Sequence, residues 1–279
     1  MAEDASISSA LAKSAASQSD GCDVHNREDQ EEDAAIGCLV SLEKLNLGPR
    51  KKLIVLSLNG LLVYRVFFDD KLRMPKTRIV PARYGKHLVF KRPFCDEFMR
   101  FCFERFEVGI WSSALERNVE GVLGCVMGDL KSKLLFEWDQ EQCTDSGFKS
   151  LEKVGKPLYL KELQNLWGKI NKQFLKKEGN FSATNTLLID DKPYKGLLNP
   201  LNTGIYPKSY KPGFAHDDAL DPNGELCLFL DGLAKADDVQ SYVKTHSFGQ
   251  KPVTPSHPQW FYYSKIIRRL SQRMSSIEI

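Results

Sequence analysis

The chain has 279 residues, of which 42% are hydrophobic and 27% charged, the balance of a folded protein that can bury a sizeable core. There are 39 lysines and arginines against 36 acidic residues, so the net charge gives no argument for a nucleic acid partner. The seven cysteines contain no CxxC pair, a pattern that indicates reduced thiols and no zinc site. No apolar run approaches the roughly 20 residues of a membrane-spanning helix, so we expect no transmembrane segment.

Residues 1–48 have the composition of a solvated tail. Serine and alanine come first, followed by an acidic run without aromatic residues, which cannot bury enough apolar surface to fold by itself. Helical spacing of apolar residues from Ile36 to Leu47 predicts a short helix at the end of this tail. Glu3 and Asp4 argue against an organellar presequence, so we expect a nuclear or cytoplasmic location ahead of a mitochondrial or plastid one.

The apolar run Leu53 to Leu56 predicts a buried central strand, and polar residues follow it at Ser57 and Asn59. Ligands bind at the carboxyl ends of strands in open α/β sheets, so these two residues are candidates for chemistry. A strand followed by an ordinary Asn-Gly turn is the alternative. Tyr64 to Lys91 then predicts an extended insertion beside this strand end, whose apolar residues either line a substrate groove or pack a hairpin.

Apolar residues spaced three and four apart predict an amphipathic helix that begins at Arg92-Pro93 and covers a sheet. Phe106 to Trp111 reads as a second strand with Ser112 at its end, and a helix over residues 114–127 follows. Residues 134–136 read as a strand and residues 143–149 as a loop. Residues 156–163 lead into a helix through Trp167, with Lys161 beside its apolar start.

Thr186 to Ile189 predicts a third buried strand, which is stopped by Asp190 and Asp191. Two carboxylates at a strand end need a cation, a metal or several amide donors to offset desolvation, so we interpret them as functional. A short strand within residues 199–207 and helical structure over residues 226–243 follow. Residues 259–273 combine aromatic and basic side chains, which either bind an anionic surface or partner, or pack on their own domain.

These strand ends come with recognisable motifs: KRPFCDEF, FEVGIWSSA, PLYLKEL and LLIDDKPYKGLLNPLNTGIYP. Together they resemble the haloacid dehalogenase superfamily, in the branch of phosphatases that act on the C-terminal domain of RNA polymerase II, also called nuclear LIM interactor-interacting-factor-like. The resemblance implies an α/β fold with a doubly wound, mostly parallel sheet and a small insertion after the first strand. It divides the chain into the tail 1–48, a phosphatase-like domain 49–246 and a basic aromatic extension 247–279.

The resemblance also implies roles for individual residues. In that family an Asp-x-Asp motif ends the first strand; its first Asp attacks the phosphate, and its second acts as acid and base. Ser112 fits the hydroxyl and Lys161 the helix lysine that hold the phosphoryl oxygens. Asp190 and Asp191 fit the acidic pair that completes a Mg²⁺ site.

The first motif departs from the family, because Ser57 stands in place of the nucleophile and Asn59 in place of the acid. A phosphorylated Ser57 would be a stable monoester rather than a labile acyl phosphate. Asn59 cannot exchange a proton at neutral pH, which removes a factor of roughly 10² to 10⁴ in rate. Magnesium also loses an anionic ligand, so its site is expected to be weakened or absent.

The leading hypothesis is a catalytically impaired phosphatase-like protein that binds a phosphoprotein or another protein partner and no nucleic acid. An active Mg²⁺-dependent phosphoserine or phosphothreonine phosphatase that uses Asp190 or Asp191 in an unfamiliar way is the first alternative. The second is a presequence receptor like the mitochondrial import subunit that shares this fold, although neither a targeting sequence nor a membrane anchor is visible.

Overall fold

The computed structural model describes residues 51–152, 155–173, 180–213 and 216–275, and the side chains up to residue 273. The tail predicted over residues 1–48, with its short helix over Ile36 to Leu47, lies outside the described residues. In the part of the chain that is described, no helix combines the length and apolar character needed to cross a bilayer.

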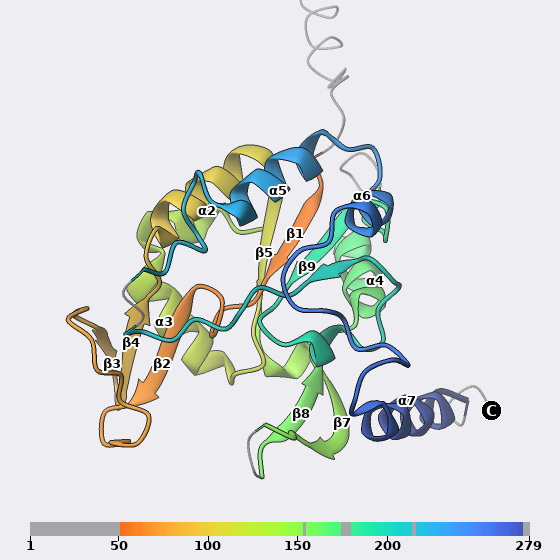
Figure 1. The fold of residues 1–279 in the computed structure, drawn as a ribbon, viewed down its shortest axis with the longest axis horizontal. Coiled ribbons are helices and arrows are strands. Elements are labelled where there is room, and N and C mark those ends of the chain that lie inside the picture. The colour runs from red at the N-terminus through yellow and green to blue at the C-terminus, as the bar shows by residue number, and fades with distance from the viewer. Residues whose placement is uncertain (1–50, 153–154, 174–179, 214–215, 276–279) are drawn as a thin grey trace, which may run out of the picture. The chain divides into compact units, whose positions relative to one another are not determined.

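A parallel five-stranded sheet forms the centre, with the first strand in its middle (Figure 1). Its order is β10 (Gly204–Ile205), β9 (Thr186–Ile189), β1 (Leu53–Leu56), β5 (Glu107–Trp111) and β6 (Phe136–Trp138). The chain therefore runs from β1 outward to β5 and β6 on one side and later fills the other side with β9 and β10. This is the doubly wound arrangement that the sequence predicts, with a topological switch beside β1.

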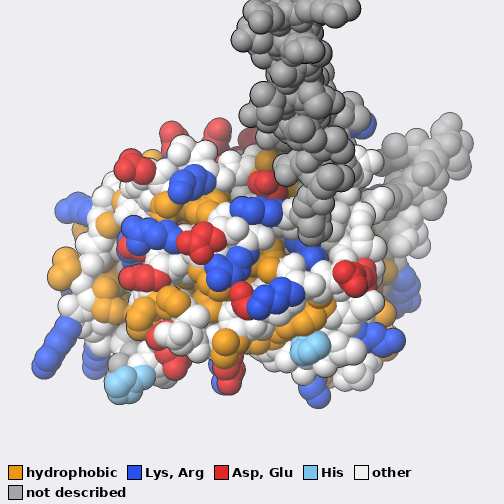
Figure 2. Space-filling view, turned by 90° about the horizontal axis from the view of Figure 1, so that it is seen from above, with side chains coloured by type: hydrophobic (Ala, Val, Ile, Leu, Met, Phe, Trp, Pro, Cys, Tyr) orange, Lys and Arg blue, Asp and Glu red, His pale blue; other side chains and the backbone are white. Residues whose placement is uncertain are grey.

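Helices cover both faces of this sheet. Their bounds are α2 (Cys95–Arg105), α3 (Glu116–Val126), α4 (Leu163–Gln173), α5 (Glu225–Lys235), α6 (Val239–Thr245) and α7 (Trp260–Ser275). Short 3-10 helices lie at η1 (Gly128–Lys133), η2 (Gln140–Gln142) and η3 (Pro193–Gly196). Figure 2 looks onto the side of α2 and α5 and shows acidic and basic side chains interspersed there rather than a field of one sign.

The side chains of β1 alternate between two cores. Ile54 and Leu56 join the larger cluster with α2, α3 and α5, whereas Leu53 and Val55 pack with α4 on the other face. Every residue of this strand is fully buried, and each apolar side chain contributes about 1.5–3 kcal/mol on burial. A strand buried on both faces carries the continuous apolar run that identified it in the sequence.

The insertion after β1 is a three-stranded antiparallel sheet in the order β2 (Val63–Phe67), β4 (His87–Lys91) and β3 (Ala82–Tyr84). Val66 and Phe90 from this sheet pack on Tyr210, while Arg65 lies one residue along β2 and therefore points to the opposite face. The extended insertion expected over residues 64–91 is thus a small folded sheet beside the end of β1.

Two local predictions were wrong. Residues 143–149, expected as a loop, contain the strand β7 (Thr144–Lys149), which pairs with β8 (Pro157–Leu160). The polar sequence of this segment predicts a loop. Ser146 is nevertheless fully buried, because its hydroxyl donates to the carbonyl oxygen of Leu158. Lys161 was expected from a helix, but it follows β8 and precedes α4, so a strand rather than a helix places it.

Helix α7 packs its apolar side on the β7–β8 hairpin. Tyr263, Ile266 and Leu270 form a buried cluster with Leu158 and Leu160, which is the second of the two possibilities left open for the aromatic and basic segment. Most aromatic residues of this segment therefore pack within the chain, whereas Phe261 is exposed. The domain boundaries at residues 48 and 246 stay predictions.

Candidate active-site pocket

The carboxyl ends of β1, β5 and β9 meet at one edge of the central sheet. Leu56 aligns with Ile110 of β5 and with Ile189 of β9, so the residues that follow these strands are neighbours. A pocket of about 250 Å³ opens there. Of the predicted site residues, Ser57, Asn59, Ser112 and Asp191 line it, whereas Lys161 and Asp190 do not.

Asp190 is fully buried outside the pocket lining, and its carboxylate is ion paired with two lysines. Its Oδ2 is 2.5 Å from the ammonium of Lys161, its Oδ1 is 3.4 Å from that of Lys195, and the Lys192 amide donates to Oδ1 at 2.9 Å. Burial alone would raise the pKa of Asp190, but these two ammonium groups and the amide hold it well below its usual range. Asp190 is therefore ionised and has no oxygen left for another cation.

Lys161 is held in place from both sides. Its amide donates to the carbonyl oxygen of Lys195, and its own carbonyl oxygen accepts from Asn199. Burial lowers the pKa of Lys161, while Asp190 opposes this shift. Its ammonium is ion paired with Asp190. The contact of Lys161 with phosphate stays a prediction.

Asp191 has the opposite environment. Ser209 donates to its Oδ2 at 2.6 Å, but its Oδ1 is buried without a hydrogen-bond partner among the described residues. Burial and the adjacent charge of Asp190 raise the pKa of Asp191. This carboxylate is the one of the acidic pair that reaches the pocket and is free to accept a ligand.

The turn after β1 is shaped around Asp191. Gly60 has φ +93°, and a Cβ at this position would lie 2.3 Å from Oδ2 of Asp191. Only glycine both tolerates this backbone conformation and leaves room for the carboxylate. The Asn-Gly pair therefore makes a turn that leaves room for Asp191, and a chemical role for Ser57 and Asn59 stays a prediction.

Ser57 and Asn59 follow directly after β1, at the positions of the two aspartates of the family's Asp-x-Asp motif. Ser57 is almost fully buried, and its amide donates to the carbonyl oxygen of Ile189. Oδ1 of Asn59 accepts from the amide of Arg65 at 2.9 Å and so braces the start of the insertion. An amide oxygen performs this bracing as a carboxylate would, but it supplies no acid or base.

Ser112 follows β5 as expected. It is buried, and its hydroxyl accepts from the amide of Ala114 at 3.2 Å, which leaves the hydroxyl hydrogen available to the pocket. Tyr194 lines the same pocket, and burial raises its pKa to about 12, so that its phenol stays protonated at neutral pH.

The donor set does not fit the magnesium site of this fold. Magnesium is usually bound through one or two carboxylates with water and other oxygens. Ser57 and Asn59 are neutral, Asp190 is committed to lysines, and Asp191 alone remains. Among the described residues, no group of three or more His, Cys, Asp or Glu side chains is placed to hold a metal ion.

Sequence reasoning missed Arg65, Lys195 and Gln250. Lys195 lies in the KPYKG turn after the acidic pair, where proximity to Asp190 was the available signal; burial would lower its pKa, but Asp190 and Asp191 raise it. Arg65 was visible only as one cation within an apolar strand. Nothing in the sequence connects Gln250 with the site.

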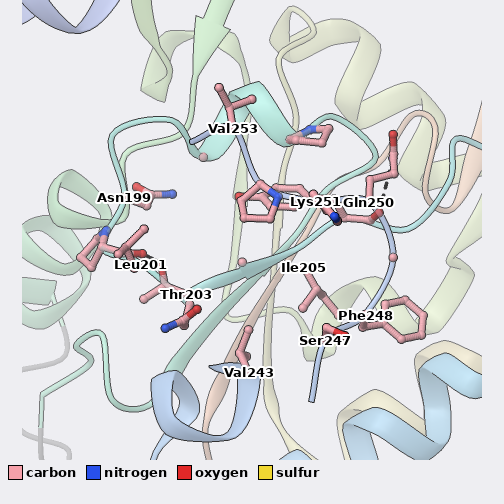
Figure 3. Close-up of a pocket in the computed structure, with 18 of the residues that line it drawn as sticks. Asn199, Leu201, Thr203, Ile205, Val243, Ser247, Phe248, Gln250, Lys251 and Val253 are labelled. Atoms are coloured by element: carbon pink, nitrogen blue, oxygen red, sulfur yellow. Dashed lines mark hydrogen bonds between the residues drawn. The ribbon is translucent and has the colours of Figure 1, made fainter. Parts of the chain in front are cut away.

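Gln250 clamps the backbone behind Asp191. Its Nε2 lies within hydrogen-bond distance of the carbonyl oxygens of Asp191, Tyr206 and Pro207. Figure 3 shows Gln250 in the wall of a second pocket, of about 330 Å³, beside the edge strand β10. That pocket is lined by amide, hydroxyl, apolar and lysine side chains, with no carboxylate among its lining residues, and we assign it no chemistry.

The fold and the site define a class: a doubly wound α/β domain of the haloacid dehalogenase type with its pocket at the end of the first strand. The family model described as NLI interacting factor-like phosphatase matches residues 52–240. The chain therefore belongs to the NLI interacting factor-like phosphatase family, the C-terminal-domain phosphatase-like branch of that class.

Individual relatives are more distant. The chain is 28% identical over 153 residues to an uncharacterized FCP1 homology domain-containing protein of Schizosaccharomyces pombe, which covers 54% of this chain and 59% of the relative. Fission yeast RNA polymerase II CTD phosphatase Fcp1 bound to beryllium fluoride is similar over 74% of this chain and 57% of its own, with 15% identity and a TM-score of 0.39. A structure of Fcp1, an essential RNA polymerase II CTD phosphatase, is similar over 82% of this chain and 64% of its own, with 14% identity and a TM-score of 0.36. The chain thus spans about three fifths of the length of these relatives.

Proposed function

We propose that this chain is a pseudophosphatase, which binds a phosphorylated segment of a partner protein without hydrolysing it. The observation that carries the proposal is the buried Ser57 at the end of β1, in the position of the attacking carboxylate. A serine nucleophile needs a base to accept its proton. Neither histidine nor cysteine is among the residues that line the pocket.

The charges around the pocket support the proposed binding of a phosphorylated segment. Four of its lining residues are basic, namely Arg65, Lys156, Lys192 and Lys195, against the two acids Glu152 and Asp191. Hydroxyl groups of Ser57, Ser112 and Tyr194 add hydrogen-bond donors. A net positive pocket with several donors suits a phosphoryl group.

An active phosphatase is the second candidate, because one observation favours it. The free Oδ1 of Asp191 and the raised pKa of this carboxyl make it a better base than an ordinary aspartate. In such an enzyme Asp191 would take a proton from Ser57 or from water. It would then need a way to cleave the phosphoserine that Ser57 attack creates.

The test is Mg²⁺-dependent hydrolysis of para-nitrophenyl phosphate and of a phosphoserine peptide. The unmodified chain is compared with the Ser57→Asp, Asn59→Asp double variant, and peptide binding is followed by fluorescence anisotropy. We expect binding without turnover in the unmodified chain and turnover in the double variant. Turnover in the unmodified chain that Asp191→Asn abolishes would support the second candidate instead.

The partner class and the location follow from the same proposal. A phosphoprotein partner in the nucleus or the cytoplasm is consistent with a family of phosphatase-like domains. Co-purification of phosphoproteins that depends on Ser112 would identify the partner.

A further inference from the structure

Arg65 presents an unusual cation to the pocket. It lies in the middle of β2 opposite Val89, lines the pocket with Ser57 and Ser112, and is half-buried. Its Nη1 is buried and has no hydrogen-bond partner among the described residues. Burial lowers the pKa of this guanidinium, and its Nη1 has lost contact with water without gaining a hydrogen bond among the described residues.

The neighbouring lysines are committed elsewhere. Lys192 is ion paired with Glu152, and Lys195 lies 3.4 Å from Asp190. The nearby acceptor, Oδ1 of Asn59, takes the backbone amide of Arg65 and not its side chain. The guanidinium is therefore the pocket cation for which the structure shows an unused buried donor.

A solvated arginine looks different, as Arg83 shows in the same small sheet. Arg83 is exposed, donates to the carbonyl oxygen of Gly85 and lies over the ring of Phe68. Simple packing of an arginine stem leaves the charged head in water. The buried Nη1 of Arg65 does not follow this pattern, because it has neither contact with water nor a hydrogen-bond acceptor among the described residues.

Without a bound metal ion, the pocket lacks the positive charge that would neutralise a phosphate, and Arg65 can supply this charge. Among the described residues of the site, Asp191 is the one carboxylate outside an ion pair, because Asp190 pairs with lysines and Glu152 with Lys192. No divalent cation is therefore well held there to neutralise a bound phosphate. A guanidinium carries a permanent charge and matches two phosphate oxygens with parallel N–H donors. The pocket, at about 250 Å³, lies below the roughly 300–1,000 Å³ of typical ligand pockets, which suits a single phosphorylated side chain.

We propose that Arg65 binds the phosphoryl group directly, with the hydroxyls of Ser57 and Ser112, so that the phosphorylated ligand is held without a metal ion. This inference rests on the proposed phosphoprotein-binding function. It adds the residue that recognises the phosphate and the independence from metal.

The test is the affinity of a short peptide that carries one phosphoserine, measured by fluorescence anisotropy in EDTA and in Mg²⁺. The unphosphorylated peptide controls for contacts other than phosphate. The variants are Arg65→Gln, Arg65→Lys and, as a matched control in the same sheet, Arg83→Gln, and thermal unfolding establishes that each is folded. We expect equal affinity in EDTA and Mg²⁺, a loss of about 10- to 100-fold in Arg65→Gln, a smaller loss in Arg65→Lys and no loss in Arg83→Gln.

Phosphopeptide binding that requires Mg²⁺, or binding that Arg65→Gln leaves unchanged, would overturn the inference and leave the proposed function standing. Equal loss in folded Arg65→Gln and Arg83→Gln would also overturn it, because the effect would then be one of general charge. Failure of the unmodified chain to prefer the phosphorylated peptide in either buffer would overturn the proposed function together with the inference.

Discussion

Asp190 and Asp191 are adjacent in sequence, yet the fold gives their carboxylates opposite roles. Asp190 anchors Lys161 and Lys195 behind the pocket, and Asp191 faces the pocket with an unpaired oxygen. Two like charges on neighbouring residues would repel, and the lysines settle which of them ionises readily. The first carboxylate is thus held by lysines of the chain, and the second keeps one oxygen without a hydrogen-bond partner among the described residues.

Asp190→Asn is expected to destabilise the fold by about 3–5 kcal/mol, because it leaves the buried ammonium of Lys161 without its counter-charge and removes one of the two carboxylates near Lys195. Urea unfolding at pH 7 measures the effect. The native pKa of Asp190 lies below its unfolded value, so its stabilisation is present above an unfolded pKa of about 3.9 and is lost as the pH falls. A difference between the two proteins that does not shrink on acidification would contradict this account.

Asp191→Asn is expected to have the opposite effect on the stability of the fold. The native pKa of Asp191 is raised, so the ionised carboxyl destabilises the fold above the unfolded pKa, and this penalty disappears in acid. The variant should therefore be more stable than the unmodified chain at pH 7 and equal to it near pH 3. Thermal unfolding at both pH values is the measurement, and a loss of stability at pH 7 would show that the attraction of Lys195 outweighs the burial of Asp191 and its repulsion by Asp190.

At the scale of elements, the turn between β1 and β2 and the helix α7 both support the pocket. The turn carries Asn59 and Gly60, and α7 lies behind the hairpin that precedes Lys161. Tyr263 of α7 stacks on Tyr194, a pocket residue, with ring centroids 6.4 Å apart. Neither the turn nor α7 contributes a charged residue to the pocket lining, so both elements act by supporting the pocket.

Gly60→Ala is expected to cost more stability than Gly85→Ala. Both glycines have positive φ, so each substitution incurs about 1–2 kcal/mol of backbone strain. At Gly60 the new methyl group would also collide with Asp191, whereas at Gly85 no atom lies within 4 Å. Chemical denaturation of the two variants gives the difference, and equal losses would mean that Asp191 moves away freely.

Tyr263→Ala should destabilise the chain by about 3–5 kcal/mol, as aromatic truncations in a core do. Phe261 in the same helix is 72% exposed against 5% for Tyr263, so Phe261→Ala should stay within about 0.5 kcal/mol. Guanidinium unfolding of both variants tests whether α7 is packed in solution. Similar small effects would indicate that the helix is not bound to the hairpin.

At the scale of the whole molecule, the site draws on more of the chain than the family domain. The family model ends at residue 240, yet Gln250 holds the backbone of Asp191 and α7 braces the hairpin. The segment after residue 240 is thus part of the structural support of the pocket. A deletion at the expected boundary of residue 246 would remove these contacts.

The response of the whole molecule to magnesium follows from the donor set. A working site at Mg²⁺ concentrations of about 100 times its Kd would stabilise the fold by about 2.7 kcal/mol. We expect no such stabilisation in the unmodified chain and a clear one in the Ser57→Asp, Asn59→Asp variant, by thermal unfolding with and without Mg²⁺. Adding Asp191→Asn to that variant should abolish it, and a Mg²⁺ shift in the unmodified chain would contradict our reading of the site.

The sequence was sufficient for the order of most core elements along the chain. Of the six predicted site residues, four line the pocket, and the roles of all six stay predictions. Apolar runs buried on both faces, as in β1 and β9, need no tertiary information to be found. Polar residues directly after such runs identified Ser57, Ser112 and Asp190-Asp191. The β7–β8 hairpin was missed because its buried Ser146 is satisfied by a backbone carbonyl that only the paired strand supplies.

What the sequence by itself determined is the class of the fold and the loss of the first-motif carboxylates, since both rest on residue types at local spacings. Only the tertiary structure decided how the remaining charges are used. Asp190 pairs with Lys161 and Lys195, while Oδ1 of Asp191 and Nη1 of Arg65 are buried without hydrogen-bond partners among the described residues. These features depend on desolvation and on distances between segments far apart in the chain. Such electrostatics follow from burial and proximity, which no local pattern of residues encodes.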